Sequence, residues 1–355
     1  MSAVKKPGVH FCIQPWTNLF LHNSGRIQPC CMNSTCLGSV YSDNLAEVWN
    51  NEKLQFIRQN IIEHDYVSAG CKPGCPIGFQ ISQGNNITGK NPKWLLAASS
   101  NSIFKENYNA FLESVENHLL HARNKPMDID IQSTESCNMQ CIMCHQHHGK
   151  KGHIPAETIS RFLTWTECIQ TIRFQGGEIF IDPDFSLFLC QLKESCKTFQ
   201  EIHVITNGTM IKVVDLLRMT SAPNPIRFIV SIDAISADVY RYIRRSTLYA
   251  KAWDTLNFLA SRQKELSRKD IVQWNFVVMK SNFHQLKDAI RIASDLDIIL
   301  HLQPIIGPYT EENIFDYPQI RPPGSLETIR ECMELSSYLK SQTTNLPTIE
   351  KKLSQ

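Results

Sequence analysis

The chain has 355 residues, of which 42% are hydrophobic and 20% are charged. Because a domain usually holds about 100 to 200 residues, this length predicts two domains, and the composition excludes wholesale disorder and a fibrous repeat. Lys and Arg number 36 against 34 acidic residues, a net charge of +2, so charge alone gives no reason to expect a nucleic acid or a membrane as partner.

The cysteines are the most informative residue type. No apolar run approaches the roughly 18 residues that a membrane span requires, so we expect a cytoplasmic protein. In a reducing compartment, 13 Cys are expected to be metal ligands, catalytic thiols or core residues rather than disulfides. Six lie in the first 75 residues and three lie together further on. The scattered four are predicted to be core residues or exposed thiols: Cys168, Cys190, Cys196 and Cys332.

Residues 1–80 are predicted to form a small metal-binding module. Cys12 and Cys30 can flank a hairpin that turns at Asn23-Ser24-Gly25, and apolar spacing predicts one helix from Leu45 to Ile62. A segment of this size has little apolar core of its own, so bound metal is the expected source of its stability.

A polar linker and a helix fill residues 81–125, and a different pattern begins at 126. Up to residue 310, short apolar strands alternate with helices, which predicts parallel pairing through right-handed crossovers and an α/β sheet or partial barrel. Residues 311–355 are predicted to form a helix, Leu326 to Leu339, and a polar tail. The six predicted strands are Met127 to Ser133, Thr171 to Phe174, Ile202 to Thr206, Ile226 to Ile232, Ile271 to Met279 and Ile298 to Ile306.

Three cysteines, Cys137, Cys141 and Cys144, follow the first of these strands with spacings of four and three positions. Three thiolates on one loop can hold three irons of a 4Fe-4S cluster and leave the fourth iron open to a substrate. Zinc is the alternative and fits less well, because structural zinc normally has four protein ligands and the triad supplies three. The fourth would then be His145, His147 or His148.

This triad resembles the signature of the radical S-adenosylmethionine (radical SAM) superfamily. Its position after strand one resembles the family's partial (β/α)6 TIM-like barrel, here preceded by the cysteine-rich module. Further stretches at successive strand ends are similar to family motifs. The resemblance implies that SAM is bound by Gly176, Gly177, Glu178, Asn207, Ser231, Asp233 and Arg244.

Within that set, the resemblance gives individual roles. Glu178 would receive the methionine ammonium of SAM, and Arg244 would pair with its carboxylate. Arg245 stands where the family usually has a glycine. The expected chemistry is one-electron cleavage of SAM to a 5'-deoxyadenosyl radical that abstracts hydrogen from a substrate. The electron would come from a donor such as flavodoxin or ferredoxin.

The N-terminal segment resembles a SPASM or twitch domain, which usually follows the barrel. That resemblance implies a second 4Fe-4S cluster on Cys12, Cys30, Cys71 and Cys75, with zinc as the alternative. The sequence does not decide whether Cys31 or Cys36 takes part, nor the oligomeric state.

The substrate is less constrained than the chemistry. Related enzymes with auxiliary clusters often modify peptides, so the resemblance implies a peptide or protein substrate in an oxidoreductase-type reaction. Oxidation or rearrangement of a carbohydrate or other small metabolite is the second hypothesis. A non-catalytic iron-sulfur or zinc protein is the third, and binding of SAM distinguishes it from the others.

Overall fold

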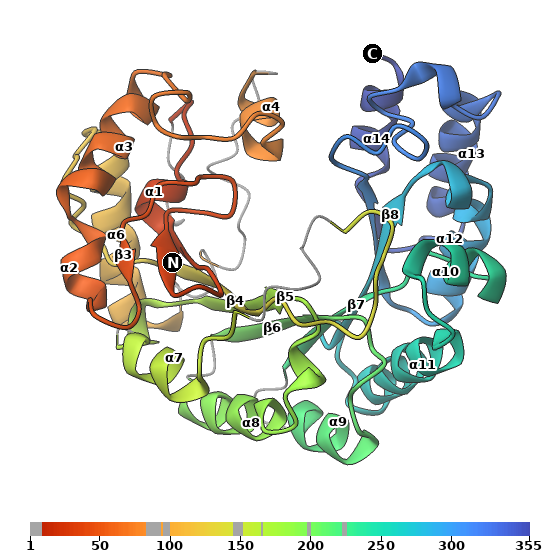
Figure 1. Cartoon of the computed structure of the whole chain (residues 1–355), viewed down its shortest axis with the longest axis horizontal. Coiled ribbons are helices and arrows are strands. Elements are labelled where there is room, and N and C mark those ends of the chain that lie inside the picture. The colour runs from red at the N-terminus through yellow and green to blue at the C-terminus, as the bar shows by residue number, and fades with distance from the viewer. Residues whose placement is uncertain are drawn as a thin grey trace. The chain divides into compact units, whose positions relative to one another are not determined.

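The computed structural model describes residues 9–82, 94, 100–144, 152–164, 166–196, 200–221 and 226–355. They form two compact units, each with strands and helices (Figure 1). Unit 1 holds Met1–Glu135, Lys151–Gly176 and Leu187–His203. Unit 2 holds Ser136–Lys150, Gly177–Ser186 and Val204–Gln355.

The strands of unit 1 follow the order β5-β4-β1-β2-β3. β1 pairs in parallel with β4 and antiparallel with β2, so the N-terminal hairpin extends the sheet that β4 and β5 begin. Gly25 turns the hairpin at φ +84°, as predicted. The strands are β1 (Asn18–Leu21), β2 (Arg26–Gln28), β3 (Gly38–Ser39), β4 (Asp128–Thr134) and β5 (Thr171–Gly176).

The prediction of one helix from Leu45 to Ile62 is wrong in one respect, because two helices occupy this range. α2 ends at Trp49, and α3 begins after Asn51, whose side chain accepts a hydrogen bond from the Leu54 amide and caps the new helix. The helices that unit 1 contains wholly or in part are α1 (Gln14–Thr17), α2 (Leu45–Trp49), α3 (Glu52–Ile62), α4 (Pro76–Ser82), α6 (Ser102–Glu116), α7 (Ala156–Phe162), η1 (Thr166–Cys168) and α8 (Phe185–Ser195).

The N-terminal segment has more core than its sequence predicts. The Trp16 indole donates to the Leu119 carbonyl at 2.9 Å, and Asn124 Nδ2 donates to the Trp16 carbonyl at 2.7 Å. Trp16 and Trp49 are almost fully buried. The missing core therefore comes from the segment that follows α6, and metal is not the sole source of order in residues 9–82.

Unit 2 is built on parallel strands in the order β7-β8-β9-β10, and β6 (Glu201–Thr206) is divided between the units. Trp274 of β8 is fully buried against Trp253 of α11, with ring centroids 5.0 Å apart, so both tryptophans belong to the packing. The strands are β7 (Arg227–Ser231), β8 (Val272–Val278), β9 (Ile299–Pro304) and β10 (Thr343–Thr344). The helices are η2 (Ile179–Ile181), α9 (Val213–Thr220), α10 (Ala237–Arg244), α11 (Tyr249–Glu265), η3 (Lys280–Gln285), α12 (Leu286–Asp295), η4 (Pro318–Ile320), α13 (Ser325–Tyr338) and α14 (Leu346–Leu353).

The predicted polar tail is wrong. After α13, β10 pairs in parallel with β9, and α14 packs against α13 and β9. Leu346, Ile349 and Leu353 are buried and follow helical spacing, a short apolar stripe among charged residues.

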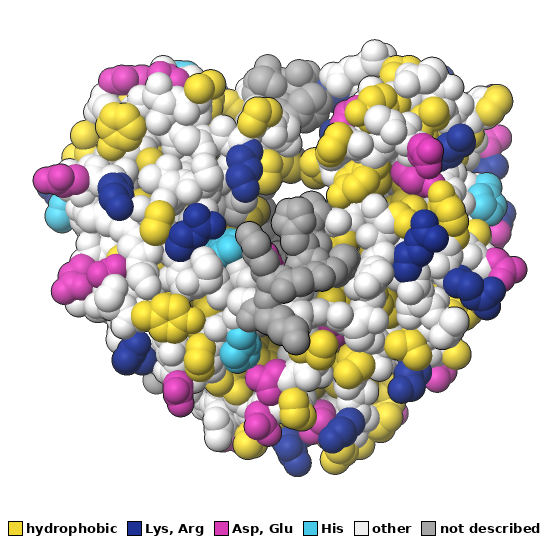
Figure 2. Space-filling view, viewed as in Figure 1, with side chains coloured by type: hydrophobic (Ala, Val, Ile, Leu, Met, Phe, Trp, Pro, Cys, Tyr) yellow, Lys and Arg dark blue, Asp and Glu magenta, His cyan; other side chains and the backbone are white. Residues whose placement is uncertain are grey.

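The α/β class and the partial-barrel succession of strands and helices are confirmed, since all six predicted strands occur within a few residues of their predicted bounds. The domain boundaries at 80, 125 and 310 stay a prediction. None of the helices in the described ranges has the length and apolar character that crossing a bilayer requires. Figure 2 shows basic and acidic side chains interspersed over one face, in keeping with the small net charge.

Candidate functional site

The three clustered cysteines lie on a loop of unit 2. Cys137, Cys141 and Cys144 are half-buried and form no disulfides. The Ile142 amide donates to the Ile243 carbonyl at 2.9 Å, which fixes the loop to α10. Burial raises the pKa of Cys137 to about 11. A thiolate there needs a nearby positive charge, which a bound metal cluster supplies. The loop thus has the donor set that an iron-sulfur cluster requires.

The alternative of a single zinc depends partly on residues outside the described ranges. Within those ranges, no three His, Cys, Asp or Glu side chains stand close enough together to hold one metal ion. His145, His147 and His148, the predicted fourth ligands, lie outside the described residues.

A network of amide and hydroxyl groups holds the cysteine loop to the end of β6. Asn207 Nδ2 donates to Asn138 Oδ1 at 2.8 Å and lies 4.0 Å from Cys137 Sγ. Asn138 Nδ2 donates to Thr209 Oγ1 at 2.9 Å, and that hydroxyl donates to Asn207 Oδ1 at 2.7 Å. The side chain of Asn207 therefore positions the loop. Asn138 and Thr209 were not predicted, although Asn138 lies inside the cysteine motif and Thr209 directly follows Thr206-Asn207-Gly208.

Glu178 is fully buried, and its carboxylate accepts hydrogen bonds from two segments of the chain. Thr206 Oγ1 donates to Oε1 at 2.8 Å, and the Asn207 amide donates to Oε2 at 2.7 Å. The Phe180 amide also donates to Oε1, at 3.2 Å. Burial raises the pKa of Glu178 to about 6, while these hydrogen bonds oppose the rise. A carboxylate has about four acceptor positions, so room for one more donor remains.

Arg244 ends α10 and bridges an acid and a cysteine. Its Nη2 lies 2.6 Å from Asp233 Oδ2, and its Nη1 lies 3.7 Å from Cys141 Sγ. Burial disfavours the charged guanidinium, but Asp233 and Cys141 outweigh it and the pKa of Arg244 is raised. The pair is buried, and Arg244 Nε has no hydrogen-bond partner among the described residues. This orphaned donor is consistent with a ligand group at the site, because buried donors are normally satisfied.

Three further residues predicted to contact SAM are Gly176, Gly177 and Ser231. Gly176 has φ +145°, and a Cβ there would lie 2.2 Å from the Thr134 carbonyl oxygen, so the close approach of β4 is enough to require glycine. Gly177 is half-buried. Ser231, also half-buried, ends β7 opposite Asn275 of β8.

Arg245 occupies the left-handed region at φ 51° and ends α10. A glycine is expected at such a helix end because it has no Cβ to clash. Arg245 offsets part of the strain by placing its guanidinium 5.5 Å from the centre of the Tyr242 ring.

The N-terminal cysteines form a second group, which lies in unit 1. Burial raises the pKa of Cys12 to about 12, with Cys75 and Cys71 close enough to add to the rise. Burial, together with Cys12, Cys31 and Cys75, raises the pKa of Cys30. The four predicted ligands therefore lie within electrostatic range of one another, and Cys31 adjoins Cys30. Within the described ranges they do not stand close enough together to hold a single metal ion. In contrast, Cys36 Sγ donates to the Gly38 carbonyl at 3.4 Å.

Comparison with known proteins gives two family matches. The radical SAM superfamily model matches residues 131–291, and the SPASM model, described as an iron-sulfur cluster-binding domain, matches residues 12–76. Together these ranges cover more than half of the chain.

Individual relatives are distant. The subtilosin biosynthesis protein AlbA of Bacillus subtilis, named for an antilisterial bacteriocin, is 24% identical over 140 residues, 38% of this chain and 31% of AlbA. A probable GTP 3',8-cyclase of Methanocaldococcus jannaschii is 25% identical over 205 residues, 54% of this chain and 63% of the cyclase. The chain thus spans less than two thirds of each relative. Among solved structures, Streptococcus suis SuiB bound to S-adenosylmethionine has a TM-score of 0.49 at 15% identity, covering 92% of this chain and 70% of SuiB.

Proposed function

This chain belongs to the radical SAM superfamily and carries an N-terminal SPASM-type iron-sulfur domain, and on that premise we propose that it is an oxidoreductase that modifies a peptide or protein. Its cofactors are a 4Fe-4S cluster, SAM and an auxiliary iron-sulfur cluster. When bound, the reduced cluster supplies the electron that cleaves SAM to the radical that abstracts hydrogen from the substrate.

The residues of the chain have positioning roles in this proposal. Cys137, Cys141 and Cys144 hold the cluster, and the network through Asn207 fixes their loop. Glu178 accepts the ammonium of SAM in its remaining acceptor position, and Arg244 faces the carboxylate. The glycines, Ser231 and Asp233 complete the contacts to SAM. A one-electron donor such as flavodoxin or ferredoxin and a cytoplasmic location remain predictions.

Two arginines of the strands, Arg173 and Arg227, bear on the choice between a peptide and a nucleoside triphosphate. Arg227 Nη2 of β7 donates to Gln273 Oε1 at 2.8 Å, and Arg173 of β5 pairs with Asp130 of β4 at 2.6 Å. A triphosphate carries several charges and is usually bound by free cationic groups. These two arginines are already engaged, so they offer a triphosphate no free cationic group. The match to AlbA, named for biosynthesis of a bacteriocin, supports the same choice.

The proposal is tested with anaerobically reconstituted enzyme, SAM and a chemical reductant. We expect peptides from the source cell to raise 5'-deoxyadenosine formation and to change in mass, whereas GTP has no effect. A carbohydrate that stimulates the reaction while peptides do not would replace the proposal by the second hypothesis.

Glu178→Gln should weaken binding of SAM by about 10- to 100-fold at pH 7.5, the effect of losing a charge-assisted hydrogen bond of about 1.5 to 3 kcal/mol. The pKa of Glu178 is raised to about 6, so its carboxylate is lost as the pH falls through that value. Affinity for SAM should therefore fall below about pH 6 in the parent enzyme and stay flat in the variant. Iron content serves as the control, because a parallel loss of iron would make Glu178 structural only.

The auxiliary ligands Cys12, Cys30, Cys71 and Cys75 are tested by metal counting. The purified enzyme should contain about eight irons per chain, and Cys71→Ala should reduce this to about four. A zinc site would give about four irons and one zinc. Residues 9–82 share a core with the segment after α6, so hydrogen exchange in α3 should change little in this variant. If the whole module unfolded without its metal, exchange in α3 would instead become much faster. An unchanged iron content would exclude Cys71 as a ligand.

A further inference from the structure

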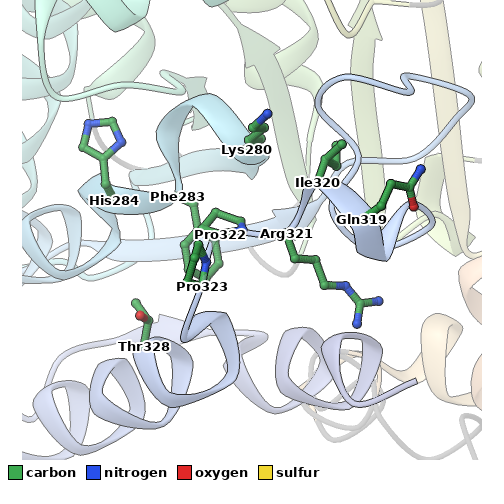
Figure 3. A pocket seen from close by; sticks show the side chains of 9 residues that line it. All are labelled: Lys280, Phe283, His284, Gln319, Ile320, Arg321, Pro322, Pro323 and Thr328. Atoms are coloured by element: carbon green, nitrogen blue, oxygen red, sulfur yellow. The ribbon is translucent and has the colours of Figure 1, made fainter.

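Unit 2 contains a cavity of about 620 Å³ whose lining includes none of the predicted cluster or SAM ligands. One wall is η3, which contributes Lys280, Phe283 and His284, and the other includes the Pro322-Pro323 turn and Thr328 of α13 (Figure 3). Its size lies within the roughly 300–1,000 Å³ of pockets that bury small ligands. Phe283, Pro322 and Pro323 give it an apolar side that can accept an apolar side chain.

The charge of the cavity has one sign. Lys280, His284 and Arg321 line it, and no Asp or Glu does. Arg321 is held by backbone carbonyls, donating from Nε to Ile314 at 2.7 Å and from Nη1 to Leu353 at 2.9 Å. Across the described residues, none of these three groups forms an ion pair with a carboxylate. Lys280 and His284 are exposed, so an acidic ligand can reach both.

One wall is tied directly to the site of unit 2. Asn282 of η3 is fully buried and donates from Nδ2 to the Asp233 carbonyl at 2.9 Å, and Asp233 is the partner of Arg244. Gln285 of η3 accepts a hydrogen bond from the Ile235 amide at 2.9 Å. The lining side chains therefore stand on a turn whose position is set by the residues behind the site.

We propose that this cavity docks an acidic segment of the peptide substrate, with a carboxylate at Lys280 and His284 and an apolar side chain against Phe283 and Pro322. The proposal rests on the proposed function and names a second contact, remote from the reacting residue. Such a contact holds a flexible substrate while a different part of it reaches the site, which raises effective concentration.

The test uses the full-length reconstituted enzyme and a fluorescein-labelled hexapeptide of alternating Glu and Leu, with a Gln and Leu hexapeptide as the matched probe. We expect the acidic probe to bind at least about fivefold more tightly, and the Lys280→Ala, His284→Ala double variant to weaken it about tenfold. Lys280→Glu should weaken it further. Lys251→Ala, an exposed lysine of α11 outside the cavity lining, is the control and should leave binding unchanged.

Equal binding of the two probes, or an unchanged affinity in the double variant with an unchanged melting temperature, overturns the proposal. Displacement of the acidic probe by equimolar inorganic phosphate also overturns it, because the cavity would then be a general anion site. The outcome is separable from that of the proposed function. Peptide modification with an unaltered KM in the double variant contradicts docking alone, whereas charge-dependent probe binding without any peptide-stimulated cleavage of SAM contradicts the proposed function alone.

Discussion

Replacing Cys137, Cys141 and Cys144 together by Ala should remove about four irons per chain and abolish formation of 5'-deoxyadenosine. The thiolates are the protein's bonds to the cluster, and the surrounding amides, such as Asn207 Nδ2 at 4.0 Å from Cys137 Sγ, cannot replace them. The loss of activity should be complete rather than partial. Iron analysis and chromatographic detection of 5'-deoxyadenosine under anaerobic conditions measure both effects.

The control for this variant is Cys36→Ala. The thiol of Cys36 donates to the Gly38 carbonyl at 3.4 Å, and on that account its loss should leave iron and activity unchanged. The triple variant should also keep the auxiliary cluster, because that group of cysteines lies in unit 1. Residual cleavage of SAM in the triple variant would contradict the assignment of these ligands.

The sequence predicts the strands well because buried parallel strands have a strong local signature. Each is a short apolar run bounded by turn residues, and the polar residues of interest directly follow several of them. Helix ends are less visible. The break at Asn50-Asn51 depends on a side-chain cap that the apolar spacing of residues 45–62 does not reveal. The polar composition after residue 340 likewise concealed α14, whose stripe holds only three buried residues.

The site was predicted as a set of contacts to SAM, and the structure adds a layer of contacts within the protein. The Glu178 carboxylate accepts hydrogen bonds from Thr206 and Asn207, and Arg244 forms an ion pair with Asp233. A motif gives residue types and order, but not the hydrogen bonds that a buried side chain makes across strands. The contacts to SAM stay predictions, whereas the links between the cysteine loop and the strand ends are visible without any ligand.

Arg58 has a structural role that its sequence context does not reveal. In the structure its side chain is fully buried, with the rings of Trp16 and Trp49 centred 5.7 and 5.1 Å away. Burial lowers the pKa of Arg58 to about 9, which leaves it charged at neutral pH.

The charged guanidinium of Arg58 donates to neutral carbonyl and amide oxygens. Nε donates to the Pro15 carbonyl at 3.0 Å, and Nη2 donates to the Trp49 carbonyl at 3.0 Å. Nη1 donates to Asn50 Oδ1 at 2.6 Å and to the Leu120 carbonyl at 2.8 Å. One side chain thus joins α1, the α2–α3 junction and the segment after α6.

Arg58→Met should lower the free energy of unfolding of unit 1 by about 3 to 5 kcal/mol, because four acceptors, two of them fully buried, lose this donor while the side-chain volume is roughly kept. Arg58→Lys should recover little, since one ammonium cannot reach acceptors spread around a planar guanidinium. Hydrogen exchange of residues 45–62 and the denaturation midpoint measure the loss. Arg218→Met on α9, an exposed arginine 3.8 Å from Asp215, is the matched control and should change stability by less than about 0.5 kcal/mol. An unchanged denaturation midpoint in Arg58→Met would show that the hydrogen bonds of Arg58 to these four oxygen atoms do not stabilise unit 1. The stability of the N-terminal region would then have to come from its metal.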